Sequence, residues 1–345
     1  MQRSRAILVL GFGLATASAA EQPCFDAQPW ADADRMFRSS SEWLGGDSAF
    51  SIDLGNDRTL WLFGDSWIDR DGEGERQGGR LIRNSVAIQT GADPSAASIE
   101  FHWKEGADGQ PLPFFPGIAD KWFWPGHGIR LGDKVVLFLN RMRSSTGGLG
   151  FASDGWNAIL IENPDDEPPD WRWSFLDVPD IAPEVRPGFA SVLLWQSYVY
   201  AFGTSDPDKT HPVYSTRWPV EDVASGDLMS PESWHLLDNG QSELTILWDE
   251  FSDSFVVFQT DGFGPANIVY RFASGLMSPW SDKQIIYRPP EYDRPNVMIY
   301  AAKAHPQLEG ADLVLTYATN TSEFAEHFSD STIYYPRFVR LLRCD

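Results

Sequence analysis

Residues 43–66 read WLGGDSAFSIDLGNDRTLWLFGDS, and this stretch predicts a β-hairpin. In Ser48 to Leu54 apolar residues alternate with small or polar ones, as in a half-buried strand. The second half, Thr59 to Phe63, is rich in β-branched and aromatic residues. The letters GNDR at 55–58 separate the two halves and are typical of a tight turn. Hairpins of this design recur along the chain and decide its fold.

Two aspartates stand at the open end of this hairpin. With the turn centred near Asn56 and Asp57, Asp47 and Asp65 lie nearly opposite each other. Opposite residues of an antiparallel pair share one face of the sheet, with Cβ atoms ~4.5–5.5 Å apart. The pattern fits either a pair of carboxylates in one site or two solvated residues at strand ends.

The hairpin returns four more times, at residues 126–140, 188–204, 242–260 and 302–320. The second strands end at Asp65, Asn140, Thr204, Thr260 and Thr319, with successive spacings of 75, 64, 56 and 59 residues. A period of this size, with four strands in each unit, is typical of a β-propeller. A β-sandwich would not need the same hairpin five times. The sequence therefore predicts an all-β, five-bladed β-propeller with four antiparallel strands per blade.

The remaining strands are assigned around these hairpins. Residues 84–90 and 98–103 complete blade one, and residues 333–342 are expected to supply the closing strands. The segment between Cys24 and Ser41 is polar with few apolar anchors and is interpreted as a lead-in.

The first strand of each blade lines the axis of a propeller, so its start should lie at one mouth of the central channel. The five starts carry Asp47, His127, Ala190 or Ser191, Glu243 and His305. Titratable groups that converge on one axis indicate a functional site.

The N-terminus has the features of an export signal. Arg3 and Arg5 precede the apolar run AILVLGFGLA at 6–15, and small residues follow at 17–20. The run is too short to span a membrane, and no second apolar stretch approaches 18 residues. We expect residues 1–20 to be a cleaved signal peptide and residues 21–345 to form one propeller domain, secreted or periplasmic.

The two cysteines, Cys24 and Cys344, stand near the two ends of the mature chain. Disulfides form in exported proteins, and a propeller must tie its last blade to its first. The sequence therefore predicts that Cys24 and Cys344 are joined.

The net charge of −22 argues against nucleic acid and anionic membrane surfaces as partners. It also disfavours a lyase acting on acidic glycans, and it fits a neutral polysaccharide or oligosaccharide. Nothing predicts a cofactor or a metal: the acidic loop with Asp69, Asp71 and Glu73 lacks a full calcium-loop pattern and is interpreted as solvated. We expect a monomer.

Five stretches together resemble one family of secreted bacterial five-bladed propellers: GGDSAFSIDL…TLWLFGDSW, RNSVAIQTG, FWPGHGIRL…VVLFLN, SPWSDKQIIY and YAAKAHPQL…LVLTYATN. That family was long catalogued as a domain of unknown function and includes the endo-D-arabinanases of glycoside hydrolase family 183. The resemblance spans roughly residues 40–343 and implies that Asp47 and Asp65 are the catalytic pair. Two departures are FGDS in place of the commoner FGDT, and His127 where an acid is often found.

Glycoside hydrolysis needs one carboxylic acid to protonate the leaving oxygen and one carboxylate as nucleophile or base. Asp47 and Asp65 are the candidates, because close like charges resist ionising together and one pKa should rise. Glu243 could replace either aspartate as the acid or as the nucleophile or base. Alternatively, it is a structural carboxylate that accepts hydrogen bonds from inner-strand amides.

Other side chains around the same mouth are candidates for substrate binding: Trp67, Arg83, Asn84, Trp122, Trp124, His127, His305 and Asn320. The tryptophans are expected in loops, where an aromatic face can pack on the C–H face of a sugar. Each candidate has an alternative interpretation. The tryptophans could pack within the blades, and Arg83 and Asn84 could be ordinary polar residues of an exposed loop. The two histidines could have their hydrogen bonds satisfied at strand starts.

The sequence thus favours an exported glycoside hydrolase of endo-arabinanase type. The rival is a non-catalytic carbohydrate-binding propeller, which would keep an aromatic mouth without needing two acids. Motifs of serine esterases, zinc proteases and phosphate-binding loops do not occur.

Overall fold

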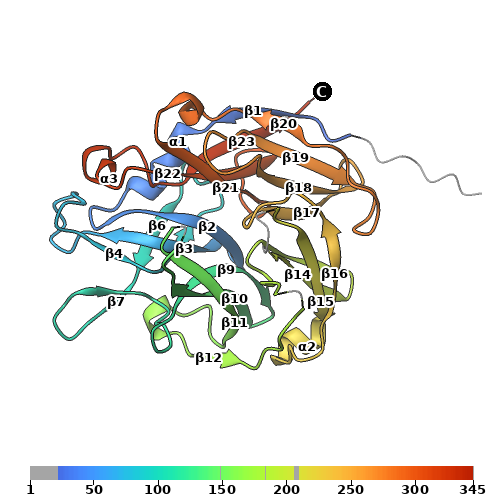
Figure 1. Ribbon diagram of the computed structural model, residues 1–345, viewed down its shortest axis with the longest axis horizontal. Helices are drawn as coiled ribbons and strands as arrows, with labels where there is room; N and C mark the ends of the chain where they lie inside the picture. Colours follow the sequence, from blue (N-terminus) through green and yellow to red (C-terminus); the bar gives the residue numbers. More distant parts are fainter. Residues whose placement is uncertain (1–21, 148, 183, 206–209, 345) are drawn as a thin grey trace, which may run out of the picture.

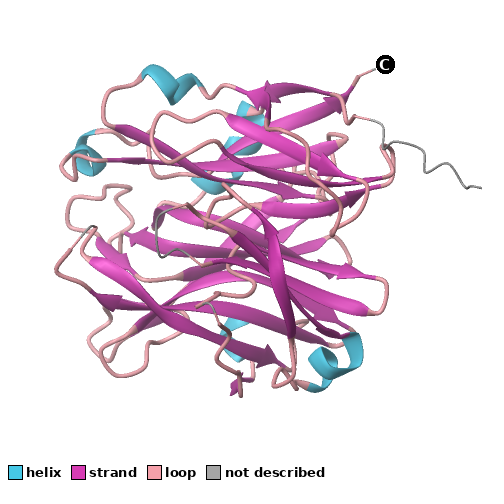
Figure 2. Cartoon of the chain, turned by 45° about the vertical axis from the view of Figure 1, so that its right-hand side comes forward, coloured by secondary structure: helices cyan, strands magenta, loops and turns pink. Residues whose placement is uncertain are grey.

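A computed structural model describes residues 22–147, 149–182, 184–205 and 210–344, so the expected signal peptide at 1–20 lies outside the described residues. Five antiparallel sheets, each with four strands in its main order, are arranged around a centre, which confirms the five-bladed β-propeller (Figures 1 and 2). In each path the strand predicted to start the blade lies at one edge of the sheet and the later strands follow outward.

Blade one is built on the hairpin of β2 (Trp43–Gly55) and β3 (Arg58–Ile68). Asn56 and Asp57 both have positive φ, 54° and 56°, as a two-residue primed turn requires. The turn therefore lies where the sequence predicted it. The blade continues through β5 (Ser85–Thr90) and β6 (Ser98–His102), and β4 (Arg80–Ile82) pairs with the far end of β3.

The next three blades follow the same plan. Blade two holds β9 (Trp122–Leu131), β10 (Lys134–Ser144), β11 (Phe151–Ile161) and β12 (Trp173–Leu176). Blade three holds β13 (Ser191–Trp195), β14 (Tyr198–Thr204), β15 (Val213–Pro219) and β16 (Glu232–Leu237). Blade four holds β17 (Thr245–Asp249), β18 (Ser254–Thr260), β19 (Ile268–Ala273) and β20 (Gln284–Tyr287).

Short elements join and cover the blades. The helical turns are α1 (Ala31–Asp34), η1 (Met36–Arg38), η2 (Pro168–Asp170), α2 (Val220–Ser225), η3 (Pro290–Asp293) and α3 (Glu326–Ser329). A two-stranded ribbon of β7 (Lys104–Glu105) and β8 (Pro111–Leu112) extends from blade one.

Blade five shows how the ring closes. Its strand order is β1-β23-β22-β21, with β21 (Val297–His305), β22 (Leu313–Thr321), β23 (Arg337–Arg343) and β1 (Phe25–Pro29). The prediction of a lead-in before Ser41 is wrong in part, because β1 is the outer strand of this blade. The prediction of several closing strands at 333–342 is wrong as well, because that segment supplies β23 alone. Figure 1 shows β1 beside β23, so the N-terminal strand completes the last blade.

The predicted disulfide is confirmed at this closure. Cys24 and Cys344 are bonded with their Cα atoms 5.5 Å apart, and the Cys344 amide donates to the Cys24 carbonyl. The bond therefore continues the β1–β23 ladder and ties the two ends of the propeller together.

We expect the Cys24→Ser/Cys344→Ser double variant to be less stable than the wild type by up to about 5 kcal/mol. The physical reason is that the disulfide closes a loop of 320 residues and so restricts the unfolded chain. Urea unfolding with and without reductant measures the effect. Under reductant the wild type should unfold at the same urea concentration as the variant; equal midpoints for the oxidised and reduced wild type would contradict the prediction.

Aromatic packing fixes blade one against blade five. Phe37 of η1 stacks on Phe338 of β23 with ring centroids 5.0 Å apart, and it meets the Trp61 ring edge to face at 4.9 Å. Trp43, at the start of β2, is fully buried in the same cluster. This packing holds the beginning of β2 in place, and β2 carries the first site residue.

Candidate active site

Irregular pairing inside the first hairpin sets the position of Asp47. The register passes from Gly46 opposite Ser66 to Ser48 opposite Phe63, so Asp47 faces the segment that ends at Asp65. A Cβ on Gly64 would stand 2.4 Å from Asp47 Oδ1, so this close approach requires glycine at 64. The predicted near-opposite placement of the two aspartates agrees with this register.

A cavity of about 530 Å³ opens at this mouth of the propeller. Every blade contributes a lining residue at or just before its inner strand: Asp47, Trp124, Phe189, Glu243 and Tyr300. Of the residues predicted to converge at this mouth, only Asp47 and Glu243 line the cavity, and in blade three Phe189 takes the place of Ala190 or Ser191. In blades two and five, however, Trp124 and Tyr300 occupy the places that the sequence assigned to His127 and His305.

Asp47 lines the cavity and accepts a hydrogen bond at Oδ2 from the Tyr300 hydroxyl, 2.9 Å away. Asn320 Nδ2 donates in turn to the Tyr300 oxygen over 3.3 Å. Burial raises the pKa of Asp47 to about 8, and the charges of Asp65 and Glu243 act in the same direction. Asp47 is thus protonated at neutral pH.

Asp65 has a different environment, although it borders the same cavity. Trp124 Nε1 donates to Oδ1 at 2.7 Å, and Arg83 Nη1 pairs with Oδ2 at 3.0 Å. Burial raises the pKa of Asp65 to about 6, and Arg83 and Trp124 oppose a larger rise. Asp65 is therefore mostly ionised at neutral pH, while Asp47 is not.

Glu243 forms a buried ion pair with Lys303, whose side chain is 2% exposed. Lys303 Nζ also donates to the Ala301 carbonyl at 3.2 Å, and Ser48 Oγ lies 3.5 Å from the other Glu243 oxygen. Glu243 therefore reaches the cavity while its charge is balanced by a neighbouring blade.

Sequence reasoning missed both Tyr300 and Lys303, because it began the fifth inner strand at residue 302. The strand β21 begins at Val297, and its pairing with β22 shifts between Tyr300 and Lys303. Ala301 has a φ of 55° at this bulge. The letters YAAKAH alone gave no indication that a bulge would bring a tyrosine and a lysine to the same site.

The two histidines lie deeper in the channel. His127 Nε2 donates to the Ser51 carbonyl at 2.9 Å, and Nδ1 accepts from the Val192 amide at 2.8 Å. Burial lowers the pKa of His127 to about 4, so the ring is neutral. His127 borders the hollow at the opposite mouth, not the cavity with the aspartates.

The prediction that His305 starts an inner strand is wrong, since His305 is the last residue of β21. Its Nδ1 atom forms a hydrogen bond with Ser51 Oγ at 2.6 Å, and its Nε2 atom forms one with Thr316 Oγ1 at 2.7 Å. Burial lowers the pKa of His305 well below its usual value. Both histidines therefore join neighbouring strands through hydrogen bonds.

Five of the other six predicted substrate-binding residues lie in or beside the cavity. Trp67, Trp124 and Asn320 line the cavity. Arg83 and Trp122 lie beside it: the Arg83 guanidinium stacks 4.3 Å from the Trp122 ring centre and reaches Asp65.

The expected loop positions of the three tryptophans are wrong, because Trp67 lies in β3 and Trp122 and Trp124 lie in β9. Asn84 is fully buried and bonds the backbone of Phe115 and Phe123. It holds the loop before β9 to blade one and does not face the cavity.

The acidic loop after β3 is only partly solvated, which corrects the sequence interpretation. Asp69 is buried, and its carboxylate accepts hydrogen bonds from the amides of Asp71, Gly74 and Glu75. These bonds hold the loop in its shape.

In the described parts of the chain no helix has both the length and the apolar character needed to cross a membrane.

Comparison with known proteins gives a family and a fold. Residues 31–343 match the family described as Domain of unknown function (DUF5005). No curated protein matches the sequence. A solved structure from Bacteroides ovatus ATCC 8483, described as a candidate hydrolase, is similar with a TM-score of 0.73 at 16% identity, over 91% of this chain and 90% of that one.

Two more distant similarities are to proteins described as α-L-arabinofuranosidases. The Lactobacillus brevis enzyme has a TM-score of 0.53 at 11% identity, over 89% of this chain and 94% of that one. The GH62 catalytic domain of Coprinopsis cinerea has a TM-score of 0.50 at 8% identity, over 93% of this chain and 97% of that one. At these identities the similarity shows a shared propeller fold.

Proposed function

The chain belongs to the DUF5005 family, and we propose that it is an exported glycoside hydrolase that cleaves a polysaccharide. The observation that carries the proposal is the pair Asp47 and Asp65, two carboxylates in unlike environments on one cavity. Titratable groups whose surroundings push their pKa values apart provide an acid and a base at the same pH.

The roles follow from the environments. Asp47 is the proton donor, because it is buried beside other carboxylates and holds its proton at neutral pH. Asp65 is the charged nucleophile or base, because Arg83 and Trp124 stabilise its carboxylate. Asp47 would protonate the glycosidic oxygen as its bond to the anomeric carbon breaks. Asp65 would either attack that carbon or take a proton from the water that attacks it, and these are the two carboxylate roles in glycoside hydrolysis.

The aromatic lining fits a sugar substrate. Trp124 and Phe151 meet edge to face with centroids 4.7 Å apart, and Phe263 packs 5.2 Å from Tyr300. Aromatic rings of this kind pack on the C–H faces of sugar rings. We propose arabinan as the substrate, with endo-D-arabinanase-like action, from the sequence resemblance. The two α-L-arabinofuranosidases of similar fold are named for the L-sugar, so arabinans of both configurations belong in the test.

Export is part of the proposal. A disulfide between Cys24 and Cys344 fits an oxidising, extracellular environment. The signal peptide at 1–20 stays a prediction from sequence.

A polysaccharide panel that includes D-arabinan and L-arabinan tests the function, with release of new reducing ends as the readout. The matched control is the Asp47→Asn/Asp65→Asn double variant, which keeps the shape of the cavity. We expect cleavage of an arabinan by the wild type and none by the variant. Binding without cleavage by both proteins would favour the non-catalytic carbohydrate-binding propeller.

The pH dependence of kcat/KM should be bell-shaped. Activity needs Asp65 ionised and Asp47 protonated, so the limbs should fall near pH 6 and pH 8 as properties of the pair. Arg83→Gln removes the cation that opposes the rise in the pKa of Asp65, so the acid limb should move to higher pH. Rate profiles from pH 4 to 10 measure both; an acid limb at the same pH in the variant would contradict the assignment of Asp65.

A further inference from the structure

A second group of ligand-type side chains lies on the outside of the propeller, where blade one meets blade two. Glu100 and His102 are alternate residues of β6, the outer strand of blade one, so they share one face. Glu167 comes from the loop between β11 and β12 of blade two. None of the three lines the cavity that holds Asp47 and Asp65.

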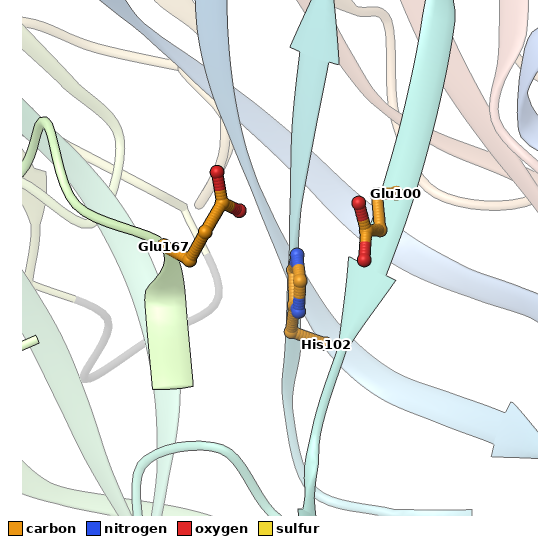
Figure 3. A group of neighbouring side chains, drawn as sticks. All are labelled: Glu100, His102 and Glu167. Atoms are coloured by element: carbon orange, nitrogen blue, oxygen red, sulfur yellow. The ribbon is translucent and has the colours of Figure 1, made fainter. Parts of the chain in front are cut away.

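The three side chains converge on one small space (Figure 3). One ligand atom from each, the imidazole nitrogen and two carboxylate oxygens, lies within 4.8 Å of the others. Ligand atoms around a tetrahedral zinc ion at 2.0–2.1 Å are about 3.3 Å apart. Both glutamates are exposed, so small side-chain rotations would complete the approach.

An independent observation at His102 points to a missing ligand. Its Nε2 atom is closed off from solvent and has no hydrogen-bond partner among the residues that the structure describes. Buried polar atoms of this kind are rare and are usually satisfied by protein, water or an ion. Within the same described residues, neither Glu100 nor Glu167 forms an ion pair, so two carboxylates face each other beside an unsatisfied imidazole.

The loop that carries Glu167 is held against blade one before any ion binds. Arg58 Nη1 of blade one donates to the Asp165 carbonyl at 2.9 Å. Arg130 of β9 forms a two-pronged ion pair with the Asp165 carboxylate at 2.7 and 2.9 Å and also donates to the Leu54 carbonyl of blade one. The position of Glu167 opposite β6 is thus fixed by neighbouring contacts and does not depend on attraction between the three ligands.

We propose that Glu100, His102 and Glu167 bind one divalent transition-metal ion of the zinc type, which joins the outer strand of blade one to the loop of blade two. One imidazole nitrogen and two carboxylate oxygens suit zinc, with a water as the fourth ligand. Calcium fits poorly, because it takes six to eight oxygen ligands, whereas this set has three ligands and one of them is a nitrogen. The ion would stabilise the fold and take no part in cleavage at the distant cavity.

Titration of metal-free full-length protein with zinc chloride, followed by calorimetry and thermal unfolding, tests the proposal. We expect one site per chain and a rise in Tm of a few degrees, because a ligand that binds only the folded state stabilises it. His102→Ala and Glu167→Gln should each weaken zinc binding at least about tenfold and abolish the rise in Tm. The two variants act on different blades, so a folding defect in one leaves the other as the test.

Two control variants separate this site from general attraction of cations to an acidic protein. Glu105→Gln removes an exposed carboxylate from the same region, and His235→Ala removes an exposed histidine on blade three. Both should bind zinc as the wild type does. Absence of binding by the wild type, equal binding by His102→Ala, or a calcium affinity equal to that for zinc would overturn the proposal.

Discussion

Asp47→Asn and Asp65→Asn are each expected to lower kcat/KM on a cleavable glycan by about 10²–10⁴, because positioned acid and base groups contribute rate factors of that size. Asparagine keeps the shape of the side chain but neither donates a proton as an acid nor carries the charge of a base. The reducing-end assay measures the loss. For Asp65→Asn the loss should hold across the whole pH range, since no carboxylate remains to ionise.

Although Asp47→Asn should lose activity, its thermal stability should increase. The folded-state pKa of Asp47 is raised from 3.8 to about 8, so between these values the folded protein holds a proton that the unfolded chain has lost. The free energy of unfolding from this group therefore falls as the pH rises from about 4 to 8. The Tm of Asp47→Asn should exceed that of the wild type by an amount that grows over this window.

The outcome that would contradict the assignment is specific. If both aspartate variants cleave at near wild-type rates, the catalytic pair is elsewhere and the carbohydrate-binding alternative gains. If an aspartate variant loses activity and also unfolds at a much lower temperature, the carboxylate supports the fold and its catalytic role is not established.

The sequence predicted the parts of this molecule that depend on local pattern. The alternation in Ser48 to Leu54, the turn at Asn56 and Asp57, and the recurrence of the hairpin led directly to five blades and to the opposed Asp47 and Asp65. These features are set by residues close in sequence, so a reading along the chain can find them.

Contacts between distant segments escaped prediction. The closing strand β1 looked like a polar lead-in, because half of an outer strand faces solvent and its partner β23 lies at the other end of the chain. The bulge in β21 gave no periodic signal, so Tyr300 and Lys303 were missed and His305 was misplaced. Burial and the charge of Glu243 raise the pKa of Asp47, while Arg83 and Trp124 limit the rise for Asp65. These contacts join segments far apart in the sequence, which is why the sequence predicted the pair but not its division of roles.

Lys303→Met should destabilise the protein by about 3–5 kcal/mol, because it leaves the Glu243 carboxylate without its partner in a buried position. Lys303 Nζ also lies 4.3 Å from the centre of the Phe50 ring, so the ammonium group is enclosed on several sides. Thermal and urea unfolding measure the loss. Because the pair joins blade four to blade five at the axis, the cost should appear in global unfolding.

The double variant Glu243→Gln/Lys303→Met decides what Glu243 does. It removes both charges, so most of the lost stability should return, as for other buried pairs replaced as a unit. We expect this folded variant to keep measurable hydrolysis, because Asp47 and Asp65 retain their partners Tyr300 and Arg83. A loss of activity as deep as that of Asp47→Asn, in a double variant as stable as the wild type, would move the role of proton donor from Asp47 to Glu243.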